Sequence, residues 1–232
     1  MLVAGCYNNT ARIWTLENGA CKIISATSGS ILSIAFLPKR LVALGCRDGS
    51  IEVWKAKGQN EAILMETIVG HKHAVKSLAF VQLAGKRLLI ASEDATLKYL
   101  DVSPLLGSKK ALENHRKMAG GKPLVQCMKK LTGNKVCMYF SLMLPVLITE
   151  AIIQGAVTSL AVSPDRKWVV SGSDDHCIRF FDLETATLHS MIQGHNDSVT
   201  SLDLSQTGKI LVTGGKDGKV RMCTFLNFYF IV

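Results

Sequence analysis

Three groups of side chains in the sequence are of types that could support catalysis, metal binding or phosphate binding. His71 and His73 stand two residues apart, residues 174–176 read Asp-Asp-His, and residues 214–219 read GGKDGK. A hydrolase needs a nucleophile, a base and an orienting group, a zinc site needs suitably spaced ligands, and a phosphate loop needs the Walker spacing. None of the three groups meets these requirements. The sequence therefore predicts no catalytic residue, no bound metal, no cofactor and no small-molecule substrate.

These groups flank a short strand pattern that recurs along the chain. The pattern reads ARIW at 11–14, IEVW at 51–54, LKYLD at 97–101, IRFFD at 178–182 and VRMC at 220–223. Six residues before each large terminal side chain, or before Cys223, stands a residue that favours a hairpin turn, namely Asn8, Asp48, Asp94, Asp175 or Asp217. A further copy fits Thr132–Phe140, so that successive copies lie 40, 46, 40, 41 and 42 residues apart. A period of about 40–45 residues is typical of four-stranded propeller blades.

Two Gly-His pairs lie at a fixed distance before the turn aspartates. Gly70-His71 lies 23 residues before Asp94, and Gly194-His195 lies 22 residues before Asp217. Together with the turn residues and the terminal aromatics, these pairs resemble the WD40-repeat family. The resemblance implies an all-β fold, a β-propeller of four-stranded antiparallel blades. About six repeats would cover residues 1–232 and end near Trp14, Trp54, Leu100, Phe140, Phe181 and Cys223.

The register of the repeats predicts individual strands and incomplete blades. We expect strands at 31–36, 41–46, 50–55, 62–68, 74–80, 87–92, 96–101, 156–162, 167–173, 177–182 and 187–192. The first blade lacks its first strand, the fourth is degenerate, and the last is incomplete unless residues 227–232 form its fourth strand. A shortened chain or a fragment of a larger propeller would explain these gaps.

The resemblance also implies a chain of hydrogen bonds through each blade, from the turn Asp through His and a strand hydroxyl to Trp. The candidate residues are Asp48, His71, Asp94, Ser171, Asp175, His195, Thr213 and Asp217. No repeat has all four residue types, and Cys223 replaces the expected Trp. We therefore expect packing between sheets to dominate, with Cys223 buried.

Positive charge is concentrated in one segment. The formal charge is +9 overall, but +4 for residues 1–101, +7 for 102–135 and −2 for 136–232. We expect 103–135 to be a basic insertion within the degenerate fourth blade. Lysine and arginine neutralise nucleic-acid phosphates, so the candidate polyanion contacts are Lys109, Lys110, Arg116, Lys117, Lys122, Lys129 and Lys130. Because aromatic residues that could stack on bases are lacking, a solvated insertion is the alternative.

Cysteine usage and hydropathy predict the location of the protein. The seven cysteines are odd in number and include no Cys-x-x-Cys pair, which is typical of reduced thiols. The N-terminus has no secretory signal pattern, and the longest uncharged stretch, 136–149, has 14 residues, fewer than the ~20 that cross a bilayer. We expect an intracellular protein, in the cytoplasm or the nucleus, that is not secreted and does not bind membranes.

The loops of such a scaffold would carry its function. The residue before each turn Asp or Asn should project on one face, joined by residues after the Gly-His pairs. The candidates for this partner face are Tyr7, Arg47, Lys72, His73, Glu93, Gly133, Asp174, Asn196 and Lys216. The sequence thus predicts a non-catalytic protein-interaction scaffold in a multiprotein complex. The alternative is an RNA-associated propeller of a ribonucleoprotein or ribosome-assembly complex that uses residues 109–135.

Overall fold

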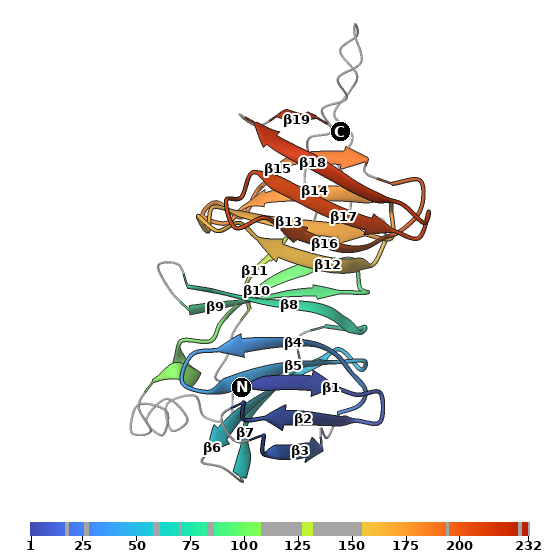
Figure 1. Ribbon diagram of the computed structural model, residues 1–232. Coiled ribbons are helices and arrows are strands. Elements are labelled where there is room, and N and C mark those ends of the chain that lie inside the picture. The colour runs from blue at the N-terminus through green and yellow to red at the C-terminus, as the bar shows by residue number, and fades with distance from the viewer. Residues whose placement is uncertain are drawn as a thin grey trace, which may run out of the picture. The chain divides into compact units, whose positions relative to one another are not determined.

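The computed structural model is built almost entirely of β-strands (Figure 1). It describes residues 1–16, 19–25, 28–57, 61–69, 71–82, 86–107, 127–131, 155–193, 195–226 and 229–231. In these residues the only other element is a 3-10 turn, η1 (Pro104–Leu106), and no helix is long or apolar enough to span a membrane. The chain divides into two compact units, Met1–Asp94 with Lys98–Met128, and Ala95–Leu97 with Lys129–Val232.

Three sheets are formed by the chain up to β11. The first has three strands in the order β1-β2-β3, and the other two have four strands in the orders β4-β5-β6-β7 and β11-β10-β9-β8. The strands are β1 (Leu2–Gly5), β2 (Thr10–Trp14), β3 (Cys21–Ser25), β4 (Ile31–Leu37), β5 (Leu41–Cys46), β6 (Ser50–Lys57), β7 (Glu61–Val69), β8 (Val75–Gln82), β9 (Lys86–Ser92), β10 (Leu97–Asp101) and β11 (Cys127–Leu131).

Two further sheets follow in the second unit, in the orders β12-β13-β14-β15 and β16-β17-β18-β19. Their strands are β12 (Val157–Val162), β13 (Trp168–Ser173), β14 (Cys177–Asp182), β15 (Leu188–Gln193), β16 (Val199–Leu204), β17 (Ile210–Gly215), β18 (Val220–Leu226) and β19 (Tyr229–Ile231). The eleven strands for which the sequence predicted bounds are all present, and their ends differ from the expected ones by two residues at most.

The sequence predicted an incomplete last blade unless residues 227–232 formed its fourth strand. Tyr229–Ile231 does form it, pairing antiparallel with Thr224–Leu226 and covering the edge that β18 would otherwise leave open. Another expectation is corrected. Residues 127–131, expected within the basic insertion of a fourth blade, instead form β11 beside β10 and complete that sheet. The fourth copy itself, Thr132–Phe140, lies outside the described residues.

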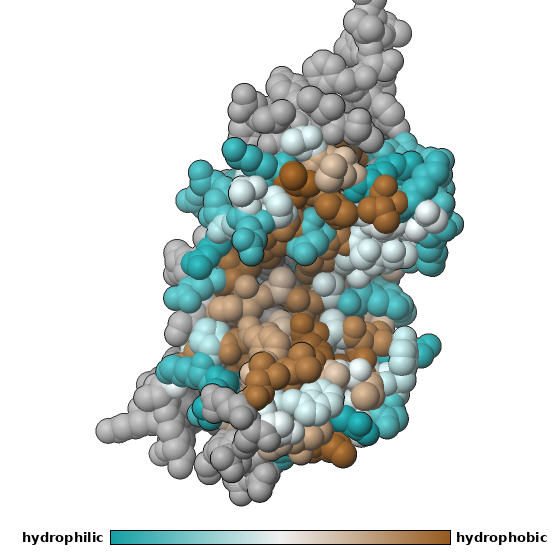
Figure 2. All heavy atoms as spheres, in the orientation of Figure 1, coloured by the Kyte–Doolittle hydropathy of each residue, from teal (hydrophilic) through white to brown (hydrophobic). Residues whose placement is uncertain are grey.

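Apolar side chains between neighbouring sheets form the core of each unit. In the first unit one cluster joins β4–β7 to β8–β10, with Leu41, Ile51 and Ile90 at 1% exposure or less. In the second unit Phe180 and Ile178 pack against Val199 and Leu211 of the following sheet. On the surface of each unit that is visible in Figure 2, hydrophobic residues lie toward the middle and hydrophilic ones toward the margins. Apolar contacts between neighbouring sheets thus hold the sheets of each unit together.

The first strand of each four-stranded sheet carries the same irregularity. The register of β4, β8, β12 and β16 shifts just before a serine, at Ser33, Ser77, Ser159 and Ser201. A small residue pairs with each serine, and at Gly172 an added Cβ would lie 2.6 Å from Val199 Cγ1. Glycine there lets the next sheet approach, so bulge and glycine together set the spacing between sheets.

Candidate functional site

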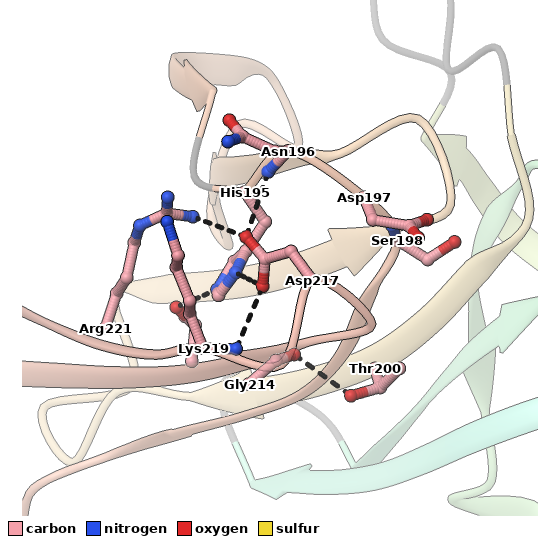
Figure 3. A network of polar contacts seen from close by, with 10 residues as sticks. His195, Asn196, Asp197, Ser198, Thr200, Gly214, Asp217, Lys219 and Arg221 are labelled. Atoms are coloured by element: carbon pink, nitrogen blue, oxygen red, sulfur yellow. Dashed lines mark hydrogen bonds and ion pairs between the residues drawn. The ribbon is translucent and has the colours of Figure 1, made fainter.

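The most extensive polar network lies at the turn between β17 and β18 (Figure 3). His195 Nδ1 is 2.9 Å from Asp217 Oδ1, and His195 Nε2 is 2.9 Å from Thr213 Oγ1. The backbone N–H groups of Asn196 and Lys219 donate to the two carboxylate oxygens of Asp217 at 3.1 and 3.2 Å. His195 and Thr213 are 1% exposed. The network therefore joins the loop before β16 to the β17–β18 hairpin and satisfies buried polar groups.

These donors determine the ionisation of Asp217. Burial raises the pKa of its carboxyl, but the Asn196 N–H, the His195 ring and the Lys219 N–H together hold that pKa well below its usual range. The carboxylate therefore stays ionised in mildly acidic solution.

We expect Asp217→Asn to lower stability at pH 7 and to lose this effect in acid. Because the pKa of Asp217 is lower in the folded state, its stabilisation is complete above the unfolded-state pKa of about 3.9 and disappears as pH falls toward the folded-state pKa. Urea denaturation of both proteins at pH 7, 5 and 3 measures this difference. A constant gap between their midpoints at all three pH values would contradict the prediction.

A smaller version of the network lies in the β8–β11 sheet. His71 Nδ1 is 2.9 Å from Asp94 Oδ2, and the Lys72 N–H donates to the same oxygen at 3.3 Å. The hydroxyl of Ser92 donates to the His73 carbonyl at 3.0 Å and accepts from the Asp94 N–H at 3.2 Å. The loop before β8 is thus tied to the β9–β10 turn.

In the β12–β15 sheet an arginine binds the turn aspartate. Arg179 Nη1 and Nη2 donate to the two oxygens of Asp175 at 2.9 and 2.6 Å, and the guanidinium side chain is 3% exposed. Ser171 pairs with Arg179 across the strands and is also buried. The sequence prediction named Asp175 and Ser171 but missed Arg179. The sequence feature that could have indicated Arg179 is an arginine four residues after the turn aspartate. The same spacing occurs between Asp217 and Arg221.

The β4–β7 sheet buries a carboxylate that the sequence prediction also missed. Glu52, at 0% exposure, accepts from the N–H and hydroxyl of Ser28 at 3.0 and 2.7 Å and from Trp54 Nε1 at 2.9 Å. The turn residue Asp48 accepts from the N–H and hydroxyl of Ser50 at 3.0 and 2.7 Å. Glu52 thus links the loop before β4 to the strand of Trp54, whereas the β8–β11 and β16–β19 sheets use a histidine to tie the corresponding loop.

The expected partner-face residues occupy equivalent turn positions. The N–H of the residue before the turn aspartate donates to a carbonyl just before the first strand of the same sheet, in the pairs Arg47–Ser30, Glu93–Ala74, Asp174–Ala156 and Lys216–Ser198, at 2.9, 3.0, 2.9 and 2.9 Å. Tyr7 is 74% exposed, Asp174 is half-buried, and the remaining described candidates are exposed, namely Arg47, Lys72, His73, Glu93, Asn196 and Lys216. Each unit therefore presents these side chains on pinned turns.

Some expected residues cannot be placed. Gly133 and the basic residues Lys109, Lys110, Arg116, Lys117 and Lys122 lie outside the described residues, whereas Lys129 and Lys130 lie on β11.

Among the described residues no three His, Cys, Asp or Glu side chains gather as a metal site would need. Cys21 is exposed, whereas Cys46 and Cys223 are buried, and burial raises the pKa of the Cys46 thiol to about 11 and also raises that of Cys223. Burial and a raised pKa make both thiols weak nucleophiles.

The comparisons with known proteins agree with this geometry. A family model described as WD domain, G-beta repeat, matches residues 146–182 and 186–223. Residues 146–182 and 186–223 are therefore WD40 repeats. The two WD40 matches end at β14 and β18, the strands that carry Arg179 and Cys223, so the Arg179–Asp175 and His195–Asp217 contacts lie within WD40 repeats.

The relatives found include Transducin beta-like protein 3 of three mammals. The chain is 24% identical to the Bos taurus protein over 185 residues, 23% to that of Mus musculus and 20% to that of Homo sapiens. Each alignment covers 79% of this chain and 20% of the relative. The chain thus spans about a fifth of the length of these relatives.

Proposed function

We propose that this chain is a non-catalytic scaffold that binds other proteins through its pinned turns, as part of a multiprotein complex inside the cell. The observation that carries the proposal is the repeated backbone bond before the turn aspartate, which fixes Arg47 and Glu93 at equivalent positions in one unit and Asp174 and Lys216 in the other. Side chains on fixed backbone lose less entropy on binding than those on mobile loops. A standard interface needs about 800 Å² per partner, which several adjacent turns can supply.

The charges on these turns suit mixed protein surfaces. Glu93 forms an ion pair of 2.6 Å with Lys76. Arg47, Lys72 and Lys216 are exposed cations in turns or loops at the corresponding end of their sheets. Rim charges of both signs steer a complementary partner and select against others.

We expect the triple variant Arg47→Glu, Lys72→Glu and Lys216→Glu to capture at least about tenfold less of its protein partners than the wild type, because reversed charges repel a complementary surface. The measurement is affinity capture at low salt followed by identification and quantification of the bound proteins. The matched control reverses Arg40, Lys167 and Lys209, three exposed cations on hairpins at the other ends of the strands. Equal capture by both triple variants would overturn the assignment of this face.

The same experiment tests the RNA-associated alternative, which rests on the basic segment 109–135. Nuclease treatment before capture should leave the protein partners bound if the turns hold them. If instead the partners disappear with nuclease, and also on deletion of residues 109–122, which keeps β11 in the chain, the basic segment is the functional site and the scaffold proposal fails. RNA binding of that kind would weaken steeply with salt.

A further inference from the structure

A cavity of about 400 Å³ lies within the second unit, between the β12–β15 and β16–β19 sheets. Ile178 and Ile192 form one wall, Thr213 and Cys223 line the opposite side, and Asn196 and Arg221 also border it. Ile178 and Cys223 are 0 and 2% exposed, whereas Asn196 is exposed, so the cavity runs from the core to the loop before β16. Its size lies within the roughly 300–1,000 Å³ of typical ligand pockets.

The cavity lies at a position that other sheets fill with a large side chain. Counted six residues from the turn aspartate, Cys223 corresponds to Trp54, Leu100 and Phe181. Leu100 and Phe181 are both 1% exposed, and the indole of Trp54 packs against the cluster that contains Ala11, Ile13 and Ile24 of the preceding sheet.

The surroundings of Cys223 match those of Trp54. The counterparts of Ala11, Ile13 and Ile24 are Ile178, Phe180 and Ile192, which belong to or pack against the cluster of Cys223. Similar apolar residues of the preceding sheet thus face the indole of Trp54 in the β4–β7 sheet. In the β16–β19 sheet they face the small thiol of Cys223 and the cavity beside it. Polar side chains, among them His195 and Thr213, also line the cavity, but the side formed by Ile178 and Ile192 can accept the face of an aromatic ring.

We propose that this cavity binds an aromatic side chain supplied by a protein partner. The inference rests on the proposed scaffold function, since the cavity opens at Asn196, one of the partner-face residues. The isoleucine wall contacts the ring, and the side-chain amide oxygen of Asn196 at the border can accept a hydrogen bond from the N–H of tryptophan or the O–H of tyrosine. Aromatic anchors in such pockets dominate many protein interfaces.

The test uses the full chain and N-acetyl-tryptophanamide, a probe that carries the side chain and two peptide bonds but no partner surface. We expect a dissociation constant on the order of 1 mM by ligand-observed NMR. N-acetyl-leucinamide should bind at least several-fold more weakly. Failure of the tryptophan probe to bind, or equal binding of the leucine probe, would overturn the proposal.

Two variants locate the probe. Cys223→Trp fills the cavity with the side chain of the chain itself and should weaken binding at least about tenfold, and Cys223→Leu should weaken it less. The matched control is Val212→Trp, which adds an indole on the neighbouring strand, where the side chain is 39% exposed and pairs with Met222 across the strands. Unchanged binding in a folded Cys223→Trp or Cys223→Leu protein would place the probe elsewhere and refute the site.

The outcome is separable from that of the scaffold proposal. Probe binding needs no partner, so a cavity that binds the probe while the turn variants capture partners normally would refute only the assignment of the turns. A cavity that rejects the probe while charge reversal abolishes capture would leave the scaffold standing and remove the aromatic anchor.

Discussion

Asp175→Ala is expected to lower the free energy of unfolding by about 3–5 kcal/mol, because it leaves the guanidinium of Arg179 buried without its carboxylate. The Arg179 side chain is 3% exposed and donates two hydrogen bonds to Asp175. Burying the guanidinium without this partner has a high free-energy cost. Urea denaturation followed by circular dichroism measures the loss, and hydrogen exchange of β13 and β14 shows whether it originates in this sheet.

The double variant Asp175→Leu with Arg179→Met is the control. It removes both charges and retains apolar volume, so its stability should lie within about 1–2 kcal/mol of the wild type. The single and double variants therefore separate the cost of an unpaired charge from the cost of disturbed packing. If Asp175→Ala were as stable as the double variant, Arg179 would not depend on Asp175.

Glu52→Ala is expected to cost about 2–4 kcal/mol. The substitution removes the common acceptor of the Ser28 N–H, the Ser28 hydroxyl and the Trp54 indole, and it leaves a cavity at a fully buried position. Each buried donor that loses its partner costs about 1–3 kcal/mol, reduced where water or a neighbour replaces the acceptor. Thermal and urea denaturation measure the change, and red-shifted tryptophan emission would report a wetter Trp54.

Lys55→Ala serves as control for Glu52, because Lys55 lies on the same strand but is exposed. It should change stability by less than about 0.5 kcal/mol. Glu52→Gln keeps the shape and one acceptor oxygen, so its effect should lie between the two. A Glu52→Ala protein as stable as Lys55→Ala would show that the buried carboxylate contributes nothing to holding the loop before β4.

The spacing of turn residues and strand-end aromatics predicted most of the strands. Because Asp48, Asp94, Asp175 and Asp217 each close a two-strand hairpin, their positions fixed strands on both sides, and the strand ends agree with the structure. Local rules of this kind act over a few residues and are readable from one sequence. The assignment of residues 127–131 was wrong, and the completeness of the last sheet stayed open, because which open edge takes a strand depends on tertiary pairing rather than on local pattern.

The polar centres were only half predictable. The His195–Asp217 and His71–Asp94 pairs were implied by the resemblance to WD40 repeats, and both are present. Glu52 and Arg179 were missed because a charged residue in an alternating strand ordinarily faces solvent. Their burial becomes intelligible only when Ser28 and Asp175 are seen beside them. The cavity at Cys223 was likewise invisible, since a small residue creates a void only if its neighbours fail to fill it.

The difference between the polar centres has a consequence for how similar hairpins avoid exchanging places while the chain folds. Repeat proteins are prone to such misassembly because their parts resemble one another. If the β5–β6 hairpin replaced the β17–β18 hairpin, Leu44 would take the place of Thr213, and His195 would lose its hydroxyl partner. Glu52 would at the same time lose its hydrogen bonds from Ser28. This exchange would bury polar atoms without partners, which is costly. The different polar partners of Glu52 and Thr213 therefore disfavour exchange of these two hairpins.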